Sequence, residues 1–405
     1  MISVEEALTR ITGAFGVLDS EQVPLGEALG RVAAEDVTAR VTQPPVAVSA
    51  MDGYAVRAAD LAQIPAALEV VGEAPAGRAF AGRVGNGQAV RIFTGGPVPD
   101  GADCIVIQEN TEVQGARVTV NEGAEKGRFI RPAGLDFKQG DVGIKAGKRL
   151  GPRDIGLAAA MNVPVLRVRR RPVVAILSTG DELVGVGETV GPNRIIGSNG
   201  PALAAFVAAN GGVPLELGIA ADTPQSLQDA ARRAEGADLL VSTGGVSVGA
   251  RDLVQGALQE IGLEVDFWQV AMRPGKPLLF GLLGRLPILG FPGNPVSALV
   301  CAVVYLRPAL DAMLGRVRDD RRGTALLGVD LPANDHRQDY LRSRLSVDAN
   351  GNRVATPFSR QDSAMLAFLA DADCLVVRPP KAPPAKAGAK VSIIVLADAE
   401  SRFDP

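Results

Sequence analysis

Glycine-rich segments that follow apolar runs are the parts of this chain best suited to chemistry. In LLVSTGGVSVGARD (239–252) an apolar run, typical of a buried strand, ends in a Gly-Gly pair and leads through Asp252 into a helical pattern. Such glycines let backbone N–H groups approach a phosphate, and a helix N-terminus favours negative charge. A carboxylate beside a phosphate requires a cation such as Mg²⁺ between them. A plain turn at the end of a strand is the alternative interpretation.

Two further apolar runs also end in carboxylates. VVAILSTGDELV (173–184) places Asp181 and Glu182 after its strand, where they either hold a hydrated Mg²⁺ or remain solvated loop acids. Asp222 follows a third run and either joins a cation site or caps the next helix. Ligands of an open α/β sheet bind outside the carboxyl ends of its strands, so we expect Glu182, Asp222 and Asp252 along one sheet edge.

Two turns carry groups suited to an anion. Arg273 and Lys276 flank a Pro-Gly turn, where their charges suit phosphate or oxyanion oxygens, although a basic turn between strands also fits. Gly293 and Asn294 precede Pro295, a residue suited to the first position of a helix. That helix start is therefore either an anion site or an ordinary cap.

Four polar residues stand beside glycine or proline turns in the first third of the chain. Asp52 lies in SAMDGYAV, Thr94 precedes the glycines of FTGGPVPDG, and Arg131 and Asp136 lie in FIRPAGLDFKQGD. Each segment alone is also typical of a glycine turn in a β domain. Only their combination and order carry functional information.

The composition excludes several classes of protein. The 405 residues suggest roughly two to four domains, and 47% hydrophobic residues support packed cores. A net charge of −3 and 4% aromatic residues argue against a nucleic-acid-binding surface. The three cysteines match no zinc motif and suit a reducing cytosol. The single histidine, His336, is expected in a surface loop.

No segment predicts export or membrane insertion. The N-terminal MISVEEALTR lacks the basic and apolar regions of a signal peptide. The longest uncharged apolar run, 296–306, is shorter than the about 20 residues that a bilayer requires. We therefore expect a cytoplasmic protein with no membrane segment.

Periodicity predicts where the helices and strands lie. Ser3 and Glu6 form a capping-box pattern before a first helix, and a helix at 152–161 is expected to pack against it. Ser198 or Asn199 is expected to cap a later helix. Further helices are expected near 199–210, 223–235, 251–261 and 294–314, and strands at 172–178, 213–219, 238–242, 267–271, 277–283 and 286–290.

These patterns divide the chain into four parts, of which the third is a three-layer α/β domain with a mainly parallel sheet. The parts are an N-terminal elongated helical module (1–41 and 138–168), an inserted β module (42–137), the α/β domain (169–318) and a β-rich C-terminal domain (319–405). In the last part Asn350-Gly351 predicts a hairpin, followed by strands at 374–377 and 391–396.

The order of the polar segments resembles that of the MoeA family, the molybdopterin molybdenumtransferases, which are related to the E domain of gephyrin. The resemblance rests on the succession of SAMDGYAV, TGGPVPDGAD, IRPAGLDFKQGD, STGDEL, STGGVSVGARD, RPGKP and GFPGNPVSA, which covers nearly the whole chain. It implies a MogA-like molybdopterin-binding α/β domain and a β-barrel-like C-terminal domain. It also implies the last step of molybdenum cofactor synthesis, in which molybdate is inserted into adenylylated molybdopterin and AMP is released.

The resemblance extends to cofactors and partners. It implies dependence on Mg²⁺ or Zn²⁺ and a homodimer whose active site lies between the α/β domain of one subunit and the β module of the other. Contact with the molybdopterin adenylyltransferase, which makes the substrate, is a further expectation. Nucleic acids and membranes are not expected partners.

The same resemblance assigns roles to residues. The catalytic residues would be Asp52, Thr94, Asp252 and Lys276, and the metal ligands Glu182, Asp222 and Asp252. The substrate would be bound by Arg131, Asp136, Ser178, Thr179, Gly180, Gly244, Gly245, Ser247, Gly249, Arg273, Pro292, Gly293, Asn294, Pro295 and Ser363. Lys276 and Arg273 would neutralise phosphate or molybdate oxygens. Asp52 and Thr94 would place molybdate or an attacking water.

The chain departs from the family pattern at two points. Many relatives carry Lys-Pro-Gly-Lys where this chain has Arg273-Pro-Gly-Lys276, and arginine keeps the charge without the point geometry of lysine. A QGS-like turn is here Gln361-Asp362-Ser363, which adds a negative charge where an oxyanion is expected.

Three other functions remain as alternatives. The α/β domain alone also resembles the molybdopterin adenylyltransferases, although the inserted β module and the C-terminal domain argue against that activity. A receptor-clustering scaffold would be expected to carry a long linker or a second enzymatic domain, which this sequence does not resemble. A pyrophosphatase-type nucleotide hydrolase would use the same carboxylates.

Overall fold

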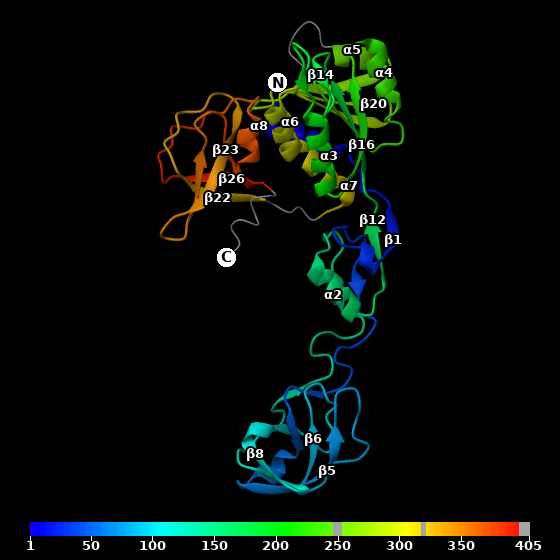
Figure 1. The fold of residues 1–405 in the computed structure, drawn as a ribbon, viewed down its shortest axis with the longest axis vertical. Helices are drawn as coiled ribbons and strands as arrows, with labels where there is room; N and C mark the ends of the chain where they lie inside the picture. The colour runs from blue at the N-terminus through cyan, green and yellow to red at the C-terminus, as the bar shows by residue number, and fades with distance from the viewer. Residues whose placement is uncertain (246–252, 317–320, 397–405) are drawn as a thin grey trace. The chain divides into compact units, whose positions relative to one another are not determined.

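The computed structural model describes residues 1–245, 253–316 and 321–396, and the chain folds into two compact units (Figure 1). The first unit consists of Met1–Glu21, Gly30–Val32 and Arg169–Pro405, and the second of Gln22–Leu29 and Ala33–Val168. The chain passes between them in the paired strands β1 (Ser20–Pro24) and β12 (Val165–Arg169).

A six-stranded sheet forms the centre of the first unit. Its order is β16 (Val213–Ala220), β13 (Val173–Thr179), β17 (Leu239–Thr243), β21 (Leu286–Phe291), β20 (Pro277–Leu283) and β18 (Leu263–Gln269). The first four strands run parallel, while β20 and β18 are antiparallel to their neighbours. The prediction of a mainly parallel sheet is confirmed, but the strand expected at 267–271 begins earlier, at Leu263.

Helices cover both faces of this sheet, as a three-layer domain requires. Alternate residues of β13 point to opposite faces: Val174 joins one core and Ala175 the other. The first core contains side chains of α1 (Val4–Gly13), α3 (Asn199–Ala209), α6 (Pro295–Cys301), the π-helical turn η4 (Ala302–Leu306) and α7 (Arg307–Leu314). The second contains side chains of α4 (Pro224–Arg232) and α5 (Leu253–Gln259).

The first helix packs differently from the sequence-based expectation. Ser3 caps α1 by accepting a hydrogen bond from the Glu6 backbone N–H at 3.0 Å, but the Glu6 carboxylate binds Arg10 instead of closing the capping box. The apolar stripe of α1 packs against α7 in the first unit, whereas α2 (Pro152–Ala160) is buried in the core of the second. The predicted packing of these two helices is therefore wrong, because an amphipathic face specifies burial and not its partner.

The continuous helix from Pro295 to Leu314 is long and apolar enough to cross a membrane by length and composition. However, 67% of its most apolar window is buried inside the protein, where it lines the first core. A core helix of a globular domain has the same composition. Its exposed surface is therefore small, and its apolar side chains are accounted for by packing.

A closed barrel forms the C-terminal part of the first unit. Its strands are β22 (Arg322–Leu327), β23 (Gln338–Val347), β24 (Arg353–Pro357), β25 (Cys374–Arg378) and β26 (Lys390–Val395), and pairing of β23 with β25 closes the ring. The short strand β19 (Met272–Arg273) pairs in parallel with the first two residues of β23. The predicted hairpin at Asn350-Gly351 is confirmed between β23 and β24, as are the strands β25 and β26.

The second unit contains a β module and a smaller helical part. The module's sheet has the order β7 (Cys104–Ile107), β4 (Gly53–Val56), β6 (Gln88–Ile92), β5 (Ala66–Ala74), β9 (Arg117–Val120) and β8 (Thr111–Gln114). The short pairs are β3 (Val48–Ser49) with β10 (Ile130–Arg131), and β2 (Val37–Thr38) with β11 (Val142–Ile144). Helix α2 packs with residues near β2 and β11 in one core.

Candidate active site

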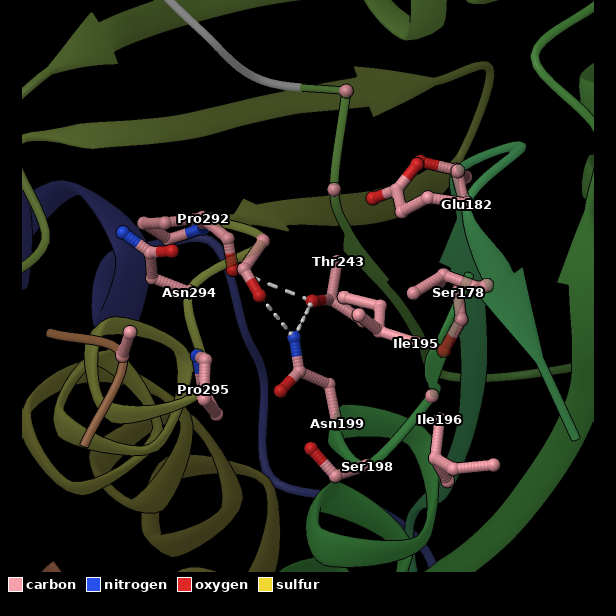
Figure 2. Close-up of a pocket in the computed structure, with 18 of the residues that line it drawn as sticks. Ser178, Glu182, Ile195, Ile196, Ser198, Asn199, Thr243, Pro292, Asn294 and Pro295 are labelled. Atoms are coloured by element: carbon pink, nitrogen blue, oxygen red, sulfur yellow. Dashed lines mark hydrogen bonds between the residues drawn. The ribbon is translucent and has the colours of Figure 1, made fainter. Parts of the chain in front are cut away.

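A pocket of about 650 Å³ opens at the carboxyl ends of β13, β17 and β21 (Figure 2). This is the sheet edge at which the strand-end motifs were expected to meet. Eleven of the expected site residues line this pocket. They are Ser178, Thr179, Gly180, Glu182, Asp222, Gly244, Gly245, Pro292, Gly293, Asn294 and Pro295. Ser247, Gly249 and Asp252 lie outside the described residues.

Two glycines make the close packing of this edge possible. Gly244 has φ = +95°, and a Cβ atom there would lie 2.3 Å from the Thr179 carbonyl oxygen. Gly180 has φ = +147°, and a Cβ atom there would lie 2.8 Å from each carboxylate oxygen of Glu182. Only glycine adopts these conformations without strain. The turn after β17 therefore requires glycine at position 244, because its backbone closely approaches the end of β13.

Negative charge accumulates beside the pocket after β13 and β16. The Asp222 backbone N–H donates to the Asp181 side chain at 3.1 Å, which ties the two loops together. Partial burial, helped by the charges of Asp181 and Glu182, raises the pKa of Asp222. Helix α4 is capped by Thr223, whose side chain accepts from the Ser226 N–H, so the alternative role of Asp222 as its cap is excluded.

The chemistry of these donors suits a hard cation. Glu182 and Asp222 offer carboxylate oxygens, and the described residues that line the pocket include no cysteine or histidine. Oxygen ligands fit Mg²⁺, whereas zinc sites usually include nitrogen or sulfur. Within residues 1–245, 253–316 and 321–396 no three acidic, cysteine or histidine side chains cluster closely enough to hold a metal. The expected third carboxylate, Asp252, lies outside these ranges.

A hydrogen-bonded network joins three elements at the pocket wall (Figure 2). The Asn199 Nδ2 atom donates to Thr243 Oγ1 and to the Gly293 carbonyl oxygen, both at 2.7 Å. Thr243 Oγ1 donates in turn to the Pro292 carbonyl oxygen at 3.3 Å. The start of α3 is thereby fixed to the ends of β17 and β21.

The sequence predicts neither side chain of this network as a site residue. It predicts Asn199 only as a helix cap, and Thr243 carries no separate signal within its motif. Neither expected residue caps α3 through its side chain: Ser198 makes no capping hydrogen bond, and the Asn199 amide is used in the network. An asparagine beside a predicted sheet edge was the available signal.

The C-terminal barrel supplies one edge of the pocket. Asn294 Nδ2 donates to Ser363 Oγ at 2.8 Å, and the Val296 N–H donates to the Ser363 carbonyl at 3.2 Å. Arg342, whose side chain is fully buried, holds the Gln361-Asp362-Ser363 turn through Gln361 Oε1 and the Asp362 carbonyl. Burial lowers the pKa of Arg342. The sequence does not single out this arginine, which acts on the pocket through the turn.

The two basic residues of the RPGKP turn have different surroundings. Arg273 does not line the pocket, because its guanidinium pairs with Asp339 and, at 3.6 Å, with Asp335 of the barrel. The hydrogen bond to Asp339 raises the pKa of Arg273 above its ordinary value. Lys276 is half-buried directly before the pocket residue Pro277 and pairs with no acidic side chain among the described residues. Lys276 therefore keeps a positive charge available next to the pocket.

The other expected residues belong to the second unit. Asp52 Oδ1 accepts hydrogen bonds from the Thr94 backbone N–H at 2.6 Å and from Thr94 Oγ1 at 2.8 Å. The backbone hydrogen bond, helped by the Thr94 hydroxyl, lowers the pKa of Asp52. The loop after Thr94 is held by the Gly95 N–H, which donates to the Ser49 carbonyl at 2.9 Å. Asp52 is therefore an exposed, ionised carboxylate in a fixed orientation.

Two further expected residues lie along the segment that follows the module's sheet. Arg131 lies in β10, opposite Val48 of β3, and is exposed. Asp136 is exposed too, and its backbone N–H donates to the Gln43 carbonyl at 3.1 Å. Both side chains are thus accessible on the second unit.

Three family models match the chain in succession. They are the MoeA N-terminal region (domain I and II) at residues 2–162, a probable molybdopterin binding domain at 175–312 and the MoeA C-terminal region (domain IV) at 324–396. A molybdopterin molybdenumtransferase of Haemophilus influenzae is 32% identical over 92% of this chain and 93% of its own. The chain belongs to the MoeA family. It is thus a member of a transferase family of molybdenum cofactor biosynthesis.

Other MoeA relatives agree in sequence and structure. A molybdopterin molybdenumtransferase 1 of Mycobacterium tuberculosis is 33% identical over 98% of this chain and 99% of its own. A crystal structure of a molybdopterin biosynthesis MoeA protein from Pyrococcus horikoshii has a TM-score of 0.83 and 30% identity, with 98% of this chain and 99% of that chain covered. The MoeA fold therefore extends over nearly the whole chain.

Proposed function

We propose that this MoeA protein is a molybdopterin molybdenumtransferase that inserts molybdate into adenylylated molybdopterin with release of AMP. The observation that carries the proposal is the pocket at the strand ends, which gathers residues from four of the motifs that resemble the family's. Its glycine-rich turns offer backbone close to the space where a pyrophosphate would lie. Its carboxylates and the nearby Lys276 provide charges of both signs for a phosphate–cation complex.

Glu182, Asp222 and Asp252 are the residues that would hold the cation. Mg²⁺ bound there would neutralise pyrophosphate charge and so make AMP a better leaving group. Lys276 would neutralise phosphate or molybdate oxygens beside it. Ser178, Thr179 and Asn294 would orient the substrate from the pocket wall. Zn²⁺ remains the alternative cation, although the oxygen donors favour Mg²⁺.

Asp52 and Thr94 would act from the partner subunit of a homodimer. The low pKa of Asp52 keeps its carboxylate ionised at neutral pH, so it can orient an attacking water or a protonated molybdate oxygen. Arg131 and Asp136 would bind substrate from the same module. We further propose that the enzyme is cytoplasmic and receives its substrate from the molybdopterin adenylyltransferase. Neither nucleic acid nor a membrane takes part.

The two departures from the family pattern have local effects. Arg273 would act by joining the pocket side of the first unit to the barrel, because its charge is already used by Asp339 and Asp335. The Asp362 carboxylate accepts a hydrogen bond from the Ala364 N–H at 2.8 Å. It therefore stabilises the turn that carries Ser363 and need not face the bound anion.

The test is a reconstituted reaction with purified protein, adenylylated molybdopterin and Mg²⁺, with and without molybdate. AMP release that depends on molybdate and yields active cofactor supports the transferase. AMP release without molybdate or cofactor would indicate a nucleotide hydrolase. Absence of turnover would favour the adenylyltransferase or scaffold and overturn the proposal.

Matched variants locate the reaction in the pocket. Glu182→Ala and Asp252→Ala should abolish transfer while the protein stays folded. Glu264→Ala removes an exposed carboxylate from β18, the edge strand at the opposite end of the sheet from β16. This control variant should leave transfer unchanged. Full activity of both the Glu182 and the Asp252 variant would contradict the assignment of these residues.

A further inference from the structure

We propose that the side-chain oxygen of Asn199 is the pocket's acceptor for the exocyclic amino group of the pterin ring. This inference rests on the proposed function and names one contact within its site. Asn199 lines the pocket at the first residue of α3 and is half-buried. Its amide has two different ends, and the network described above decides which end faces the ligand.

The neighbouring groups fix the orientation of the amide. The Gly293 carbonyl oxygen can only accept a hydrogen bond, and it lies 2.7 Å from the Asn199 amide. If the amide were reversed, two acceptor oxygens would meet at that distance, which is repulsive. The nitrogen must therefore face Gly293, and the oxygen must face the other way.

Thr243 reinforces the same orientation. Its hydroxyl has one hydrogen, and the Pro292 carbonyl oxygen, 3.3 Å away, can only accept it. Thr243 Oγ1 must then accept from Asn199, at 2.7 Å, so both amide hydrogens of Asn199 are used within the protein. The polarity of this chain of hydrogen bonds leaves no hydrogen on the Asn199 side chain to offer a ligand.

The Asn199 oxygen is consequently a fixed acceptor. In Figure 2 the amide nitrogen lies where the dashed lines meet, and the oxygen points away from them. No described residue donates a hydrogen bond to this oxygen. A half-buried acceptor of this kind is best satisfied by a donor on the ligand, because leaving it unpaired under a bound ring costs free energy.

The pterin ring supplies such a donor. The family model that spans this pocket describes a probable molybdopterin binding domain. The exocyclic amino group projects from the edge of the pterin ring and carries two hydrogens, so it is the donor that we assign to this oxygen. A site that pairs with a donor rejects an analogue that presents an acceptor there, because two carbonyl oxygens then face each other.

The experiment compares two free pteridines that differ at this position and in the hydrogen on the adjoining ring nitrogen N1. Pterin carries the amino group, and lumazine carries a carbonyl oxygen in its place. Binding of each to the full-length protein is measured at pH 7 by ligand fluorescence. We expect the wild type to prefer pterin by about tenfold, the usual effect of one hydrogen bond lost or mismatched. Asn199→Ala should abolish that preference, so that the two pteridines bind with about equal affinity.

Thr243→Val is the matched control. It removes the hydroxyl that braces Asn199, while the Gly293 carbonyl still orients the amide. This variant should weaken binding of both pteridines equally, or lower stability, and keep the preference for pterin. A structural role of Asn199 alone would make the two variants behave alike, and that result would overturn the proposal.

The remaining outcomes separate this inference from the proposed function. A wild type that transfers molybdenum but shows no preference, or binds neither pteridine, refutes the contact and leaves the transferase standing. A preference that survives in Asn199→Ala assigns the donor to another residue and also refutes it. A wild type that prefers pterin through Asn199 but lacks transfer would refute the enzyme assignment alone.

Discussion

Replacement of Gly244 by alanine tests whether the pocket depends on the contact between β13 and the end of β17. Gly244 has φ = +95°, in the region that side chains rarely adopt. The new Cβ atom would lie 2.3 Å from the Thr179 carbonyl oxygen and 2.8 Å from Thr179 Oγ1. Both contacts are far shorter than van der Waals distance, and the first is to backbone, which cannot rotate away.

The expected cost has two parts. A residue with a Cβ atom in the left-handed region costs about 1–2 kcal/mol. Forcing an extra carbon into a packed site costs about 1–3 kcal/mol more. We therefore expect Gly244→Ala to lower the free energy of unfolding by about 2–5 kcal/mol, and to abolish transfer because the turn must move away from Thr179.

The control is the same substitution at Gly256, in the middle of α5. A Cβ atom there would meet nothing within 4 Å, and alanine favours a helix over glycine by about 0.5–1 kcal/mol. Gly256→Ala should therefore be slightly stabilising and fully active. The two variants add the same methyl group to the same domain, so their opposite signs isolate the local geometry.

The assay is urea unfolding followed by the fluorescence of the single tryptophan. Trp268 lies in β18, in the same six-stranded sheet, so its emission reports this domain. Transfer activity is measured on the same preparations. If Gly244→Ala unfolds at the wild-type urea concentration and transfers molybdenum normally, the close approach to Thr179 is not required and the reasoning is refuted.

Two further predictions concern the cysteines and Asp52. Burial raises the pKa of the Cys104 and Cys374 thiols to about 12 and raises that of Cys301 as well, so the native protein should react slowly with Ellman's reagent and titrate three thiols only after unfolding. Fast reaction of any native thiol would contradict that burial. Thr94→Val should raise the pKa of Asp52 towards 3.8 in an NMR titration, because it removes the hydroxyl donor. The hydrogen bonds between Thr94 and Asp52 stabilise the fold above the ordinary carboxyl pKa, and this stabilisation is lost as the pH falls through the lowered pKa. An Asp52 titration that is unchanged in Thr94→Val would refute the role of the hydroxyl.

The buried strands of the α/β sheet could be predicted because strands covered on both faces are continuous apolar runs. The strand expected at 238–242 corresponds to β17 in this way. Strand β18 was misplaced because it is an antiparallel edge strand. Its Glu264 and Asp266 are exposed and interrupt the apolar run, so its first residues did not read as a strand.

Contacts between distant segments could not be predicted. Arg273 was expected to face phosphate, yet its guanidinium pairs with Asp339, 66 residues along the chain. Asn294 likewise meets Ser363 from 69 residues away. A charge or an amide has many partners of equal energy in a sequence, and only the packed fold selects among them. Many of the residues that line the pocket were therefore predictable, while their partners were not.

The position of the pocket depends on the order of the strands in the sheet. The pattern of apolar residues along the sequence does not reveal this order. The chain leaves β13 through α3 to β16 on one side, then crosses through α4 to β17 on the other side of β13. The neighbouring strands β13 and β17 are followed by α3 and α5, and these two helices lie on opposite faces of the sheet. A crevice opens at such a reversal, and ligands bind there. Asn199 at the start of α3 donates hydrogen bonds to Thr243 at the end of β17 and to Gly293 after β21, so its side chain joins the elements that border this crevice.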